Sequence, residues 1–244
     1  MSRARIEPHI LIPSCARATA DGHLRVRQPA GAGLYTTISL ASGVAITNFD
    51  TACAWLEALL QAAFPAGGFT VTPGTDSATI AAGAAFDLVW TDTDVRSYFG
   101  FASASYLNTS SLASDTGPAG RFTSTLAADC EFFDRLVFQT STSHGGTTGG
   151  VYLARHEGET LTLTITAAEI DHFVRVLGRL KCGNRARVWL DSTTATSFDW
   201  TATDWTGYRV MALHDPSNEL DLSDWLGSDN ELYRRVSLKL VEVL

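Results

Sequence analysis

Histidine and cysteine are the first residues to consider, because they hold most transition metals and carry much acid–base and nucleophilic chemistry. The sequence has six histidines and four cysteines. They are His9, His23, His144, His156, His172, His214, Cys15, Cys53, Cys130 and Cys182. No two histidines have H-x-H or H-E-x-x-H spacing, and no two cysteines form a C-x-x-C pair. The sequence therefore predicts no metal centre of this kind.

Catalytic and phosphate-binding motifs are also missing from the sequence. It contains no G-x-S-x-G elbow, no Walker A motif and no G-x-G-x-x-G fingerprint. His144-Gly145-Gly146 is similar to the H-G-G oxyanion turn of some hydrolases, but without a nucleophile elbow it indicates an exposed loop. No catalytic residue, no cofactor-binding residue and no cofactor are predicted, and we expect no enzymatic activity.

Carboxylates and tryptophans leave two alternatives open. The acidic segment 215–231 could supply oxygen ligands for Ca²⁺, but it lacks EF-hand order and its carboxylates also suit the first turn of a helix. Trp189, Trp200 and Trp205 could line a sugar platform or pack a sheet. The separation of two carboxylates, which decides glycoside hydrolysis, is a three-dimensional fact. A carbohydrate-binding module or a glycoside-acting enzyme therefore remains an alternative.

Composition bounds the class of protein. Charged residues make up 18% of the 244 residues, below the average of about 25%, and short polar side chains fill the difference. Such a surface suits permanent protein contacts, because little side-chain entropy is lost, and it equally fits an ordinary Thr/Ser-rich β protein. The net charge of −8 argues against nucleic-acid binding. No run reaches the ~18 apolar residues of a membrane helix, and no signal peptide is recognisable, so we expect synthesis in the cytoplasm and no membrane partner.

The first 27 residues form the one basic stretch. Its arginines are Arg3, Arg5, Arg17, Arg25 and Arg27. They could contact phosphate or an acidic neighbour, but we expect a surface arm that lies on a partner subunit. The spacing of the cysteines does not favour disulfides, so free thiols are expected, with Cys53 a small buried hydrophobe.

Alternating patterns predict that strands dominate. The runs 24–28 and 34–40 flank a Gly-rich turn, and the runs 68–72 and 78–82 flank the turn 73–76. Further strands are expected from the alternating segments, which are 86–90, 160–165 and 235–240.

Two amphipathic helices interrupt the strands. Asn48 is a good N-cap for the first, near 48–63, whose apolar residues recur at spacings of three and four. Thr166 and Glu169 form a capping box for the second, near 167–180.

Shorter features connect these elements. Helical turns are expected at 94–99 and 220–226, each closed by a glycine. The polar stretch 102–120 is read as a loop and a domain boundary, and 140–150 as a hairpin tip or an exposed insertion. We therefore predict a mainly β, α+β protein of two β-sandwich-like domains, residues 1–120 and 121–244, each with one longer helix.

Parts of the chain resemble structural proteins of tailed bacteriophages. In the first half, a strand, an amphipathic helix and further strands lead to Trp90 and the sequence YFGF at 98–101. Virion proteins of this kind end such a unit in L-G-F, where Phe99 replaces the leucine. In the second half, a strand, a capped helix and an aromatic strand in 161–191 are followed by 208–213 and by a final alternating strand in 231–244. That order is similar to β-sandwich domains of distal-tail and minor tail proteins.

The resemblance implies a non-enzymatic virion protein, made in the host cytoplasm. It would assemble with itself into an oligomeric ring in the tail or tail tip (distal tail, baseplate or minor tail) and contact other virion proteins. A capsid decoration or neck protein is an alternative within the same particle. No catalytic, metal or cofactor residues come with the resemblance. On physical grounds, exposed strand edges need covering, and head-to-tail contacts in a ring would cover them.

Overall fold

The computed structural model describes residues 3–8, 10–11, 23–40, 45–46, 48–123, 128–142, 148–181, 186–191, 209–213, 225–226 and 233–242. The elements of the first half are β1 (Arg3–Pro8), β2 (Ile10–Leu11), β3 (His23–Arg27), β4 (Thr36–Ser39), β5 (Ala45–Ile46), α1 (Phe49–Ala63), β6 (Thr70–Pro73), β7 (Ala78–Trp90), α2 (Thr93–Phe99) and β8 (Ser105–Ala113). Those of the second half are β9 (Phe122–Thr123), β10 (Ala128–Thr142), β11 (Thr148–Thr166), the 3₁₀ turn η1 (Ala167–Glu169), α3 (Ile170–Lys181), β12 (Ala186–Asp191), β13 (Arg209–Leu213), β14 (Trp225–Leu226) and β15 (Tyr233–Glu242).

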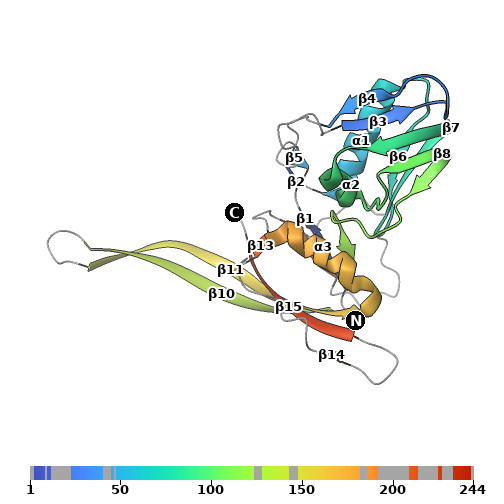
Figure 1. Ribbon diagram of the computed structural model, residues 1–244. Helices are drawn as coiled ribbons and strands as arrows, with labels where there is room; N and C mark the ends of the chain where they lie inside the picture. Colours follow the sequence, from blue (N-terminus) through green and yellow to red (C-terminus); the bar gives the residue numbers. More distant parts are fainter. Residues whose placement is uncertain are drawn as a thin grey trace.

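The first lobe is an antiparallel sheet with helices on one face (Figure 1). Its strand order is β4-β3-β7-β6, and β8 pairs with β7 as well. The helix α1 contributes Phe49, Leu56 and Leu60 to a core that it shares with the sheet and with the aromatic residues after β7. Each such side chain, fully buried, stabilises the fold by roughly 1.5–3 kcal/mol.

The second lobe is a larger antiparallel sheet in the order β10-β11-β15-β13-β12-β1-β9, with β14 also pairing with β15. Its core joins alternate residues of β11 and β15 to the apolar stripe of α3. The central members are Leu161, Leu163, Ile165, Val236, Leu238 and Leu240, all buried. The alternation read from the sequence in these two strands is therefore confirmed.

The first lobe is inserted between two neighbouring strands of the second. β1 pairs with β12 on one side and with β9 on the other, where Arg5 lies opposite Thr123 and Ile6 opposite Phe122. The chain thus begins in the sheet of the second lobe, leaves it to build the first lobe, and returns through β9. This pairing crosses the predicted division at residue 120; the domain boundaries themselves stay a prediction.

Local sequence signals account for the helices. The Asn48 side chain accepts a hydrogen bond from the Thr51 amide (2.7 Å), as expected for the N-cap of α1. The Glu169 carboxylate accepts from the Thr166 amide (2.9 Å), which confirms the capping box before α3. Gly100 closes α2 with a left-handed φ of 83°, also as predicted.

Three predictions about local structure are wrong. The stretch 102–120 is not simply a loop, because β8 lies within it: its Ser and Thr residues form a mostly exposed edge strand that pairs with β7. Residues 225–226 are strand β14 and not the end of a helical turn, because they pair with β15. Residues 3–8 are not a surface arm, since β1 lies between two strands and buries Ala4 and Ile6 completely.

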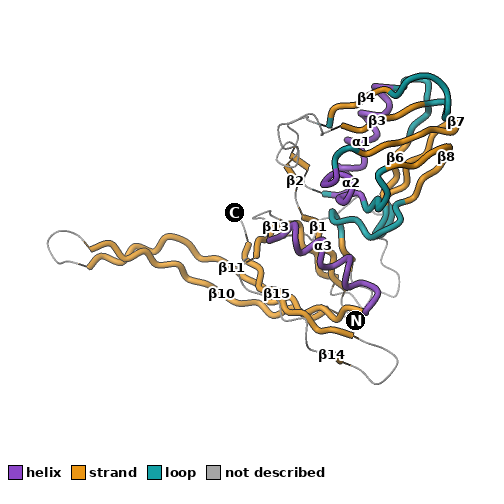
Figure 2. The backbone as a smooth tube through the Cα atoms, in the orientation of Figure 1, coloured by secondary structure: helices purple, strands orange, loops and turns teal. Residues whose placement is uncertain are grey.

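The hairpin of β10 and β11 is the longest element of the molecule. Its register runs from Ala128 opposite Leu163 to Thr142 opposite Thr148, which confirms the predicted hairpin around 140–150. β15 pairs with β11 only from Gly158 to Thr166. Beyond that point the two strands continue as a two-stranded arm that projects away from both lobes (Figures 1 and 2).

The fold class is α+β and mainly β, as predicted. Within the described residues, the layer that faces each sheet is a helix: α1 and α2 in the first lobe, α3 in the second. A second sheet packed face to face on either one, as in a β-sandwich, is not seen in that part of the chain.

Candidate functional site

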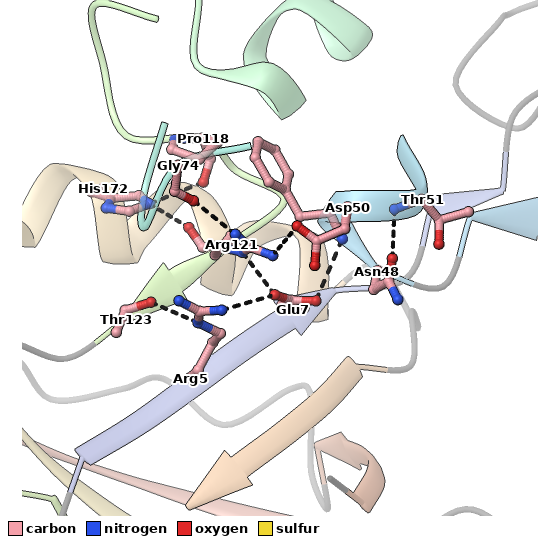
Figure 3. Close-up of polar contacts among 11 residues, drawn as sticks. Arg5, Glu7, Asn48, Asp50, Thr51, Gly74, Pro118, Arg121, Thr123 and His172 are labelled. Atoms are coloured by element: carbon pink, nitrogen blue, oxygen red, sulfur yellow. Dashed lines mark hydrogen bonds and ion pairs between the residues drawn. The ribbon is translucent and has the colours of Figure 1, made fainter. Parts of the chain in front are cut away.

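The most concentrated group of charged side chains lies where the two lobes meet, and we call it the charged junction (Figure 3). Its members are Arg5, Glu7, Asp50, Asp76, Arg121, Thr123 and His172. They come from β1, α1, the β6–β7 turn, β9 with the residue before it, and α3. The insertion of one lobe between β1 and β9 brings these distant segments together.

Arg121 is the centre of the junction, with a side chain only 2% exposed. Its Nε donates to Glu7 Oε1 (2.7 Å), its Nη1 to the Gly74 carbonyl oxygen (2.8 Å) and its Nη2 to Asp50 Oδ1 (2.9 Å). Burial alone would lower the pKa of Arg121, but Glu7 and Asp50 outweigh burial and raise the pKa. One guanidinium therefore ties β1, the β6–β7 turn and the start of α1 together.

Glu7 connects β1 to the first turn of α1. Its Oε2 lies 3.4 Å from the Phe49 amide nitrogen, at the N-terminal end of α1, where the helix dipole favours a carboxylate. Its Oε1 also lies 3.9 Å from Nη1 of Arg5. A strand of the second lobe thus supplies an acceptor to the helix of the first.

Arg5 and Asp76 occupy the other side of the junction. Arg5 Nε donates to Thr123 Oγ1 (3.0 Å), across the β1–β9 pair. Burial and the positive charge of Arg121 lower the pKa of Arg5 to about 10. The Oδ1 atom of Asp76 is shielded from solvent, and burial raises the pKa of this carboxyl to about 7, although Thr123, Arg5 and Arg121 act in the opposite direction.

His172 holds the chain segment that links the lobes. Its Nε2 lies 2.9 Å from the Pro118 carbonyl oxygen and 2.6 Å from that of Arg121. Since carbonyls only accept, Nε2 carries a proton. Burial lowers the pKa of His172. A Cβ on Gly117 would lie 2.2 Å from the imidazole Cγ, so only glycine fits between this segment and α3.

A second polar centre, Asp87, lies inside the first lobe. This buried carboxylate accepts from the Gly31 amide (3.0 Å), the Asn108 amide (2.7 Å) and Arg27 Nε (2.8 Å). The hydrogen bond from Gly31, opposed in part by burial, and that from Asn108 lower the pKa of Asp87. Asp87 therefore fixes both the β3–β4 turn and the middle of β8 to β7.

Both centres consist of hydrogen bonds and ion pairs that connect distant segments of the chain. In the charged junction, cations and carboxylates are hydrogen-bonded across segments, which suits a fixed connection between lobes. In the described residues, no three His, Cys, Asp or Glu side chains are grouped as metal ligands would be. No helix there is long and apolar enough to cross a membrane.

The residues singled out in the sequence have different outcomes. Cys53 is a fully buried free thiol whose pKa burial raises to about 12, so its interpretation as a small hydrophobe is confirmed. Arg5 and Arg27 find acidic neighbours, but within their own chain.

Other candidates are not placed by the structure. Outside the described residues lie Cys15, Arg17, His144, Cys182, Trp200, Trp205 and all of segment 215–231 except 225–226. Cys130 and Trp189 are described in backbone only, within β10 and β12. Neither the sugar-platform hypothesis nor the Ca²⁺ alternative is therefore tested.

Sequence reasoning missed Arg121 and Glu7, the two residues on which the junction depends. Their side chains bond across 114 positions of sequence, and no periodic pattern links them. One signal was present: Arg121 directly precedes the apolar Phe122, and an arginine at the edge of a buried strand needs a partner.

Comparison with protein-family models and with curated proteins finds no match to this chain.

Proposed function

We propose that this protein is a virion structural protein of a tailed bacteriophage, which assembles with copies of itself in the tail or tail tip. The virion part of the proposal is supported by the resemblance of several segments to structural proteins of tailed bacteriophages, namely 34–64, 69–101, 161–191, 208–213 and 231–244. The charge-poor composition supports the assembly part. The finer expectation, that the chain forms two β-sandwich-like domains of which the second is similar to those of distal-tail and minor tail proteins, is part of the same proposal.

One structural observation carries the proposal of assembly: the two-stranded arm of β10 and β11. A two-stranded ribbon is marginally stable in water, because each strand leaves one row of backbone N–H and C=O groups without a partner strand. Within the described residues, β10 residues 134–142 pair with β11 alone, and β11 residues 148–157 pair with β10 alone. The function of such an element is to contact something outside its own fold.

The amino-acid sequence of the arm supports the same conclusion. Residues 136–154 contain no Asp, Glu, Lys or Arg, whereas exposed strand edges that remain free are commonly protected by charge or proline. The charged junction adds a rigid base, since it fixes the two lobes to each other and so gives the arm one direction in every copy.

The experiment is the mass of the purified protein by light scattering coupled to size exclusion, over a wide range of concentrations. A discrete oligomer, such as a trimer, hexamer or larger ring, is expected. Negative-stain imaging would then show whether the oligomer is closed. A strict monomer at high concentration would contradict the proposal of assembly and favour the alternative of a carbohydrate-binding module. Binding to a panel of glycans would then be measured.

A further inference from the structure

The two sheets end in edges of very different length. The second lobe ends in β9, of 2 residues, and in β10, of 15 residues. In the first lobe, β4 and β6 have 4 residues each, and β6 ends in Pro73. The remaining edge, β8, has 9 residues. Short strands and prolines commonly protect a sheet edge from pairing with another strand. β8 and β10 are the two edges that are long enough to lack this protection.

β8 also has no charge protection. Residues 97–114 contain no Asp, Glu, Lys or Arg, and Leu107 on β8 is 62% exposed. Within the described part of the chain, β8 pairs with β7 only. The strand is held in place all the same, because Asp87 accepts its Asn108 amide and Asp115 accepts from the Tyr106 hydroxyl (3.0 Å).

The backbone direction of β8 can be read from its last bond to β7. The Ser114 amide donates to the Ala78 carbonyl oxygen (2.8 Å), so Ser114 and Ala78 form a hydrogen-bonded pair. Since such pairs alternate in an antiparallel ladder, Ser111, opposite Ala81, presents its N–H and C=O away from β7. The Ser111 carbonyl oxygen already accepts from the Thr109 hydroxyl (2.6 Å), so a partner strand would meet the Ser111 N–H and the second lone pair of that carbonyl. The free edge therefore offers backbone donors and acceptors in a fixed position.

We propose that β8 of one copy receives the β10 edge of the arm of a second copy, so that the arm continues the sheet of its neighbour. This inference rests on the proposed self-assembly and names the two surfaces that make the contact. The lengths agree: β8 has 9 residues, and the arm section of β10 runs over residues 134–142. Both strands are irregular within that length, because Asn108 has a φ of 54° and the register of β10 shifts between Val137 and Phe138. The pairing would therefore run in shorter regular stretches, such as the one around Ser111. Both strands are almost free of charged residues, so their pairing would bury few charged side chains that need a partner of opposite charge.

The placement of the two edges favours a contact between different surfaces. β8 and the end of the arm lie at opposite sides of the molecule (Figure 1). A contact of edge to arm is heterologous, and it generates rings or filaments, whereas pairing of β8 with β8 would give only a two-fold dimer. The arm of each copy would cover the β8 edge of its neighbour, and that β8 would be the third strand that the arm lacks.

The test uses two variants that each lose one of the two surfaces. Leu107→Lys places a charge on the β8 edge, and a chain in which residues 136–154 are replaced by Asn-Gly lacks the arm. Each alone is expected to be monomeric where the wild type assembles, with affinity lowered about tenfold or more, as for loss of an interface hot spot. Mixed one to one, they are expected to form a heterodimer, because one keeps the arm and the other keeps β8.

Controls separate loss of contact from loss of fold. Val174→Lys, at a 44% exposed apolar residue on α3, should assemble as the wild type does. Ser111→Pro and Thr140→Lys repeat the β8 and arm tests with minimal changes, and circular dichroism confirms that each variant is folded. The inference would be overturned by any of three results: an arm-less chain that still assembles, a folded Leu107→Lys chain that still assembles, or a mixture in which no heterodimer forms. In each of these cases the proposal of self-assembly itself would remain valid. A wild type that stays monomeric would overturn both.

Discussion

At the scale of single residues, Arg121 stabilises the contact between the two lobes. We expect Arg121→Ala to lower the free energy of unfolding by about 3–5 kcal/mol, because it leaves Glu7 buried without its cation. Arg121→Lys should retain only part of the stability that Arg121→Ala loses, because one ammonium group cannot reproduce the three directed hydrogen bonds of the guanidinium. Urea denaturation followed by circular dichroism measures both. Arg25→Ala is the matched control: this exposed guanidinium lies 4.9 Å from the Tyr35 ring centroid, and its loss should cost less than about 1 kcal/mol.

Asp76 gives the junction a pH dependence of definite sign. Its folded pKa of about 7 lies above the ordinary value of 3.8, so between these values the folded state holds a proton that the unfolded state has released. This carboxyl therefore contributes stability at low pH that is lost as pH rises towards 7. Asp76→Asn should be more stable than the wild type at pH 8 and should lack that part of the slope.

Thermal unfolding at a series of pH values from 5 to 8 measures the effect of Asp76→Asn. The matched control is Asp171→Asn, which makes the same substitution at an exposed position on α3 outside the charged junction. Equal slopes for the wild type and Asp76→Asn would show that the ionised Asp76 carboxylate is accommodated by Arg5 and Arg121, contrary to the raised pKa.

At the scale of elements, two glycines should respond to alanine with opposite signs. Gly100 ends α2 at φ +83°, and a Cβ there would lie 2.3 Å from the Thr116 carbonyl oxygen, so Gly100→Ala should cost at least about 1–2 kcal/mol. Gly178 lies inside α3 with no atom within 4 Å of its Cβ position, so Gly178→Ala should stabilise by roughly 0.5–1 kcal/mol. Chemical denaturation of the two variants side by side tests whether Gly100 ends α2 and whether Gly178 lies in the interior of α3.

The same scale shows what sequence reasoning can reach. Helices with local signals, such as the Asn48 cap and the Thr166–Glu169 capping box, were predicted within a few residues. Strand β8 was missed because its Ser- and Thr-rich composition is that of a loop, and only its pairing with β7 makes it a strand. The junction was missed for a related reason: Glu7 and Arg121 meet only because β1 and β9 are neighbours, which no local pattern encodes.

At the scale of the whole molecule, the insertion of the first lobe predicts where the chain divides into folding units. Residues 23–116 contain the complete sheet of the first lobe, both of its helices and the hydrogen bond from the Thr116 amide to the Gly100 carbonyl oxygen (3.0 Å). A fragment of these residues should fold by itself. A fragment 1–120, cut at the boundary predicted from sequence, restores the short pair of β2 with β5 but adds β1 without the strands that cover it. We expect it to be no more stable than fragment 23–116.

The reason lies in the partners of β1. Ala4 and Ile6 are fully buried between β12 and β9, and Glu7 has its cation in Arg121, so fragment 1–120 exposes two apolar side chains and removes the arginine. Thermal unfolding would be followed by circular dichroism and by the fluorescence of Trp55 and Trp90, of which Trp90 stacks on Phe101 with the ring centroids 5.5 Å apart. We expect cooperative unfolding of fragment 23–116, and a greater tendency of fragment 1–120 to aggregate. A fragment 1–120 that is clearly the more stable of the two would show instead that β1 belongs energetically to the first lobe, and that the division at residue 120 is the correct one.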